Sequence, residues 1–163
     1  MFKKIAIAAP LAFLALNSSL AFAAGEGRAS INLVATVPAT TFHVQPVDPD
    51  LIVKDQVLNY NPANGDLSNL RAQFDTRHTA GRIDASLESA AVLYNGSASV
   101  PLGVTFNGVT LTVGTAKPVV TKEEASAGRR VDMVITPTKP GSGYEPGNYT
   151  GQVHMVFDAV VEA

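Results

Sequence analysis

The seven residues Ile31-Asn32-Leu33-Val34-Ala35-Thr36-Val37 have the pattern of a β-strand. In an extended chain, alternate side chains point to the same side, so Ile31, Leu33, Ala35 and Val37 form one apolar face. An apolar face near the start of a mature chain needs a groove in which to be buried. The groove belongs either to the chain's own domain or to a second copy of the protein, and the two possibilities predict different functions.

Residues 1–23 have the features of a secretion signal. Two lysines follow the initiator methionine, residues 5–16 are apolar, and Ala21 and Ala23 form the small-x-small pattern of a cleavage site. The apolar run is too short to span a membrane, and the polar residues 17–19 interrupt it. We therefore expect an exported protein whose mature chain begins at residue 24.

The composition of the mature chain limits the classes of protein to which it can belong. Loss of the signal leaves 10 of the 12 basic residues against 14 acidic ones, a net charge of −4, so nucleic acid is not an expected partner. The sequence contains no cysteine, so an exported domain must be stabilised by burial and strand pairing alone. About 140 residues suffice for one domain with a core. Richness in Val, Thr, Gly and Pro, without Trp, is typical of strands and turns.

The pattern of apolar residues predicts about eight short strands separated by turns, and hence an all-β sandwich. Asn107-Gly108 is the clearest hairpin turn, because both positions of a type I′ turn need positive φ. Residues 78–81 form a second hairpin loop, and residues 122–127 a single helical turn. The expected strands are 31–37, 56–60, 70–76, 82–87, 100–106, 109–113, 130–136 and 149–161, with 41–44 as a further short edge strand.

No constellation of residues points to catalysis or to a bound group. His43, His78 and His154 fall on separate predicted elements without the spacing of metal ligands. The sequence contains no Gly-x-Ser-x-Gly motif and no positioned base. We therefore expect neither an enzyme nor a cofactor or metal.

Four segments of the sequence resemble the major subunits of CS1/CFA/I-type fimbriae, also called alpha or class 5 fimbriae. The resembling segments are residues 31–38, 58–63, 100–108 and 146–153, the last reading Pro-Gly-Asn-Tyr-Thr-Gly-Gln-Val. The resemblance implies an immunoglobulin-like sandwich that lacks one strand. It further implies that a periplasmic chaperone shields the open groove and that an outer-membrane usher lets the next subunit's N-terminal extension fill it.

The resemblance also assigns roles to segments of this chain. Residues 24–38 would be an N-terminal extension and residues 39–163 the pilin domain. The donor strand would present Ile31, Leu33, Ala35 and Val37 to the groove of a neighbouring subunit, and the groove would be bordered by a C-terminal strand bearing Val153, Met155 and Phe157. Its further partners would be a tip adhesin and a host-cell receptor, and its location a fimbrium on the bacterial surface.

Two alternatives stay open at this level. From the pattern alone, residues 31–37 are more simply the first strand of a complete sandwich, and only the resemblance favours a donor strand. The second alternative is a pilus-associated adhesin or another sandwich module that binds carbohydrate or a receptor.

Overall fold

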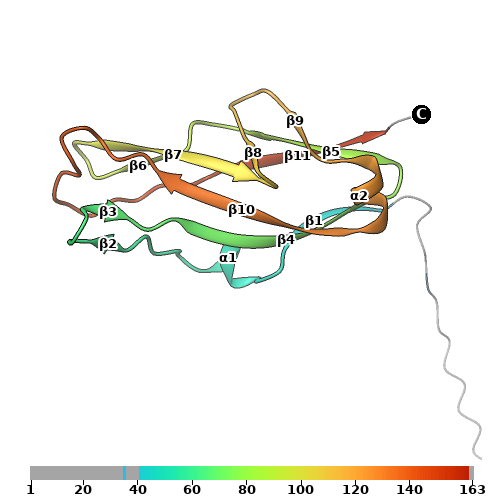
Figure 1. Ribbon diagram of the computed structural model, residues 1–163, viewed down its shortest axis with the longest axis horizontal. Helices are drawn as coiled ribbons and strands as arrows, with labels where there is room; N and C mark the ends of the chain where they lie inside the picture. The colour runs from blue at the N-terminus through green and yellow to red at the C-terminus, as the bar shows by residue number, and fades with distance from the viewer. Residues whose placement is uncertain (1–34, 36–40, 162–163) are drawn as a thin grey trace, which may run out of the picture. The chain divides into compact units, whose positions relative to one another are not determined.

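Two antiparallel sheets face each other in the described part of the chain, which comprises residue 35 and residues 41–161 of a computed structural model (Figure 1). The described strands all belong to the second of two units, which divide between residues 36 and 37. The first sheet has the order β1 (Phe42–Pro46), β4 (Leu70–His78), β10 (Arg129–Pro137), β7 (Ser99–Phe106) and β6 (Val92–Tyr94), with β8 (Val109–Thr110) beside β7. The second has the order β11 (Met155–Val161), β5 (Gly81–Leu87) and β9 (Lys117–Val120). This arrangement confirms the expected all-β sandwich.

The core lies between the two sheets and follows the period-2 alternation of the strands. Phe74 on β4, Phe106 on β7 and Met133 on β10 are buried against Ile83 and Ala85 on β5. The rings of Phe74 and Phe106 meet edge to face, with centroids 5.3 Å apart.

Polar side chains occupy the opposite face of the first sheet. There the Arg130 guanidinium donates to the Asp75 carboxylate at 2.8 Å, which lowers the pKa of Asp75 from its ordinary value of 3.8.

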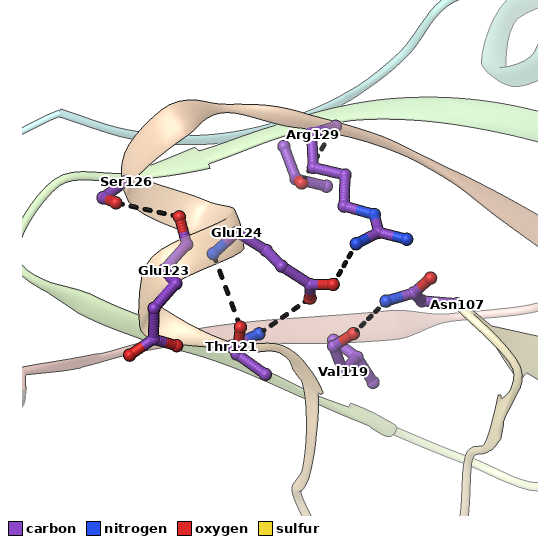
Figure 2. Close-up of polar contacts among 8 residues, drawn as sticks. Asn107, Val119, Thr121, Glu123, Glu124, Ser126 and Arg129 are labelled. Carbon is purple, nitrogen blue, oxygen red and sulfur yellow. Dashed lines mark hydrogen bonds and ion pairs between the residues drawn. The ribbon is translucent and has the colours of Figure 1, made fainter.

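The two predicted hairpins are present. Thr79 and Ala80 connect β4 to β5, and Asn107 and Gly108 connect β7 to β8. Asn107 and Gly108 have φ values of 48° and 77°, the positive values that the Asn-Gly pair was expected to supply. The Asn107 side chain also donates to the Val119 carbonyl at 2.7 Å, which joins this turn to β9 (Figure 2).

The predicted helical turn is α2 (Lys122–Ala127), and its first turn carries a complete capping box (Figure 2). The Thr121 hydroxyl accepts from the Glu124 backbone N–H at 3.4 Å, and the Glu124 carboxylate accepts from the Thr121 backbone N–H at 3.2 Å. Glu124 also pairs with Arg129 at the start of β10. These contacts hold the short helix at both ends, through Thr121 before it and Arg129 after it.

Three predicted strands are shorter in the structure than the sequence pattern indicated. The expected strand 56–60 is wrong except at its last residue, because residues 55–59 pair in no ladder. Only Tyr60 belongs to a strand, the two-residue β2 (Tyr60–Asn61). This strand pairs with β3 (Asp66–Leu67). A short helix, α1 (Asp50–Val53), precedes this segment. The expected strand 109–113 is reduced to β8, at Val109–Thr110.

The expected strand 149–161 begins only at Met155, because the chain changes sheets there. Thr150 exchanges backbone hydrogen bonds with Tyr94 of the first sheet, at 2.8 and 3.0 Å. Met155 is instead the register partner of Leu87 in the second sheet. Residues 151–154 cross from one sheet to the other and belong to no strand.

Candidate functional site

An open groove of about 420 Å³ lies against the sandwich interior. Its floor includes Phe74, Met133 and Ile135, which are core side chains of the first sheet. Residues 51–58 contribute one group of lining side chains and residues 151–155 another, and these segments form its two walls. Leu70, Leu93 and Leu102 complete the apolar lining.

Neither wall of the groove is a paired strand over most of its length. Residues 55–59 and residues 151–154 lie outside every ladder of the described chain. Within the same described residues, β11 pairs with β5 and with no strand on its other side. An apolar strip between backbone segments without ladder partners is the geometry left when a sandwich lacks one strand.

The three predicted groove-bordering side chains lie on one face of the C-terminal segment. Val153 and Met155 line the groove, and Phe157 lies next to it, with its ring centroid 4.9 Å from that of Phe106 and 6.4 Å from that of Phe74. All three are partly buried and packed against the core, whereas His154 and Val156 between them are exposed. The predicted alternation is therefore present, although residues 151–154 are not in a strand.

Most of the predicted donor-strand and cleavage residues lie outside the described residues. These are Ile31, Leu33 and Val37 of the donor strand, and Ala21 and Ala23 of the cleavage site. Ala35 is described: it is exposed and is in no helix or strand. Their roles thus stay predictions.

Sequence reasoning missed the other wall of the groove. Leu51, Ile52 and Leu58 line it, and they come from α1 and the unpaired segment behind it. The available signal was the run Leu51-Ile52-Val53, three consecutive aliphatic residues between charged neighbours. In the structure, the side chains of Ile52 and Val53 are 75% and 77% exposed.

Gly151 fixes the wall formed by residues 151–155. A Cβ atom at this position would lie only 2.2 Å from the Val92 carbonyl oxygen of β6. The backbone therefore approaches β6 more closely than any residue with a side chain permits. Together with the Thr150–Tyr94 hydrogen bonds, this contact ties the wall to the edge of the first sheet.

The three histidines lie on different segments, with His43 on β1, His78 on the neighbouring strand β4 and His154 in the C-terminal wall of the groove. His78 is buried at the end of β4, with Nδ1 3.0 Å from the Arg82 carbonyl oxygen, whereas His154 lines the groove. Over residues 41–161, the structure brings no three acidic or histidine side chains together in an arrangement for a metal ion. Nor do the helices described for this range include one long and apolar enough to cross a membrane.

The fold and its groove define a β-sandwich with one strand position left open. Residues 28–158 match the family model of the CS1 type fimbrial major subunit, and the chain therefore belongs to this family. No curated protein sequence matches the chain. Among solved structures, the CooA pilin subunit from enterotoxigenic Escherichia coli has a similar fold, with a TM-score of 0.55 and 16% sequence identity over 71% of this chain and 86% of that one.

The family confirms the resemblance seen in the sequence. The protein is a major structural subunit of a cell-surface fimbrium, in which the subunits polymerise with one another. The expectation of a structural protein rather than an enzyme agrees with the character of this family.

Proposed function

We propose that this fimbrial subunit polymerises by donor-strand exchange, in which residues 31–37 of one copy fill the groove of another. The observation that carries the proposal is the groove itself, an apolar channel whose two walls lack ladder partners. An extended segment that adds to the free edge of β11 satisfies the backbone and covers the apolar floor in one step.

The alternating pattern of residues 31–37 suits this groove. Ile31, Leu33, Ala35 and Val37 would face Phe74, Met133 and the other core side chains of its floor. Complete burial of an Ile, Leu or Val side chain contributes roughly 1.5–3 kcal/mol. Each new ladder hydrogen bond adds on the order of 1 kcal/mol, so the junction is expected to be long-lived without a covalent bond.

The same contact explains a fibre rather than a closed ring or dimer. The donor segment and the groove are different surfaces of one chain, so each copy offers one of each. A head-to-tail contact of this kind that does not close generates a filament. Catalysis has no part in this function.

The further partners follow from the same groove. Before assembly, a periplasmic chaperone would pair with the C-terminal segment that carries Val153 and Met155 and so shield the apolar floor. An outer-membrane usher would then exchange the chaperone for the next subunit, and a tip adhesin would end the fibre. Residues 1–23 would direct export, residues 24–38 would form the extension, and residues 39–163 the pilin domain. A host-cell receptor is the expected outer partner of the fimbrium.

Self-complementation tests the proposal. Residues 24–163 are produced alone and again with a second copy of residues 30–37 joined to the C-terminus by a short flexible linker. Because antiparallel pairing beside β11 needs only a hairpin connection, the appended strand should reach the groove. We expect a soluble monomer whose unfolding midpoint rises by on the order of 10–20 °C, as several kcal/mol would produce.

The matched control carries Leu33→Asp in the appended copy only. A carboxylate in the apolar groove is costly, so this version should lose most of the gain. An appended strand that leaves the midpoint unchanged would show that the sandwich is already complete and would contradict the proposal.

A further inference from the structure

A group of exposed aliphatic side chains lies on the wall formed by residues 51–58. The side chains of Ile52, Val53 and Val57 are 75%, 77% and 74% exposed, and we refer to these three as the 52–57 patch. Single exposed aliphatic residues are ordinary on protein surfaces, but three within six residues concentrate apolar surface in one short segment. Ile52 also lines the groove, whereas Val53 and Val57 do not, so the patch shares one residue with the groove wall.

The length of the connecting chain restricts what can cover this patch. If Val37 is the last side chain in a neighbour's groove, only residues 38–40 separate it from Thr41, where the described sandwich of the donating copy begins. Four residue steps span at most roughly 14 Å. The sandwich of the donating copy must therefore start next to the groove that its own donor strand fills.

The donating copy presents an apolar side chain at that start. Phe42, the first residue of β1, is 42% exposed, although its ring packs against His78 in a T-shaped arrangement with centroids 5.7 Å apart. An exposed aromatic ring held close to an exposed aliphatic patch supplies matching apolar surfaces.

We propose that the copy whose donor strand fills the groove also rests the start of its β1, including Phe42, on the 52–57 patch. This inference rests on the proposed function, because the donor strand provides the tether. The second contact fixes the angle between consecutive subunits, which the donor strand alone leaves to a three-residue connection.

The absence of cysteine from the sequence allows a clean test by thiol labelling. Val57→Cys and, separately, Val53→Cys are introduced into the full chain, and fibres assembled from each are treated with a small maleimide. The reference is the unassembled mature chain with the appended strand, which has a filled groove but no neighbour. Val113→Cys, at a valine that is 51% exposed near β8, is the matched control.

We expect the thiol at position 57 or 53 to react at least tenfold more slowly in fibres than in the unassembled reference, with less than a twofold change at position 113. Rates in fibres within twofold of the reference at both positions 53 and 57 would overturn the inference, as would equal slowing at position 113. Protection in a chaperone complex but not in fibres would assign the patch to the chaperone and would also overturn it.

The failure of this inference differs from the failure of donor-strand exchange. If self-complementation raises the unfolding midpoint while positions 53 and 57 stay reactive in fibres, only the second contact is wrong. If self-complementation produces no gain, the tether argument fails with the proposed function, whatever the labelling rates.

Discussion

Gly151 marks the residue at which the C-terminal chain leaves the first sheet and begins to line the groove. Its backbone lies so close to β6 that a Cβ atom would stand 2.2 Å from the Val92 carbonyl oxygen. The opposing atom belongs to the backbone, so no side-chain rotation relieves the overlap. The groove wall thus depends on a residue that has no side chain.

Gly151→Ala should lower the free energy of unfolding by about 1–3 kcal/mol, the usual range for an overpacked site. The measurement is chemical denaturation of the mature chain with the appended strand, in which the sandwich is complete. Gly141→Ala is the control, because a Cβ atom there meets nothing within 4 Å. Equal stabilities for the two variants would show that the wall moves freely away from β6.

The alternation at Val153, Met155 and Phe157 could be predicted from the sequence, and the side chains do share one face. The close approach at Gly151 could not. A period of two indicates which side chains lie together, but it does not indicate where a chain crosses from one sheet to another. That crossing depends on Tyr94 and Leu87, which lie far from it in the sequence.

Among the elements, α2 is stabilised chiefly by the side-chain hydrogen bonds of its first turn. The helix has six residues and buries only Ala125, so its own length contributes little stability. The capping box between Thr121 and Glu124 satisfies backbone N–H groups that would otherwise have no partner at this end.

Thr121→Ala removes the hydroxyl half of the capping box and should cost about 1 kcal/mol. Denaturation of the same self-complemented chain provides the measurement. Glu123→Gln changes the charge of the first turn but leaves both bonds of the box in place, so it should change stability by a few tenths of a kcal/mol. A loss in Thr121→Ala no larger than that in Glu123→Gln would contradict the stabilising role of the capping box.

Elements held by local chemistry are the ones that the sequence predicts well. The Asn107-Gly108 turn and α2 depend on neighbouring residues, and both are present where expected. Residues 56–59 and 151–154 have strand-like composition but lie in no ladder. A strand needs a partner as well as propensity, and the missing partner is a property of the assembled fold. The two largest errors in the predicted strands therefore coincide with the two walls of the groove.

In the molecule as a whole, the groove leaves the sandwich of a single subunit incomplete. The side chains of Phe74, Met133 and Ile135 belong to the core, yet they also line an opening between two unpaired segments. An open apolar groove and backbone segments without ladder partners both favour association in water. In a fimbrial subunit, this tendency to associate leads to ordered assembly when one particular segment fits the groove.

The apolar face on residues 31–37 could be predicted from the sequence, but the groove that buries this face could not. The same alternation suits the first strand of a complete sandwich and the donor strand of an incomplete one. The choice between them depends on whether the described sandwich has an unfilled strand position, and residues 51–58 and 151–155 frame such a position.

Assembly of two single-residue variants shows whether residues 31–37 fill the groove of a neighbouring subunit. Leu33→Asp places a carboxylate on the face that would enter the neighbour's groove, whereas Asn32→Asp places the same charge on the opposite face. Purified subunits of each are assembled, and polymer is measured by sedimentation and electron microscopy. We predict that Leu33→Asp abolishes fibres, because an unpaired charge would be buried at the junction, and that Asn32→Asp assembles like the wild type. Normal fibres from Leu33→Asp would show that this face does not enter a neighbour's groove.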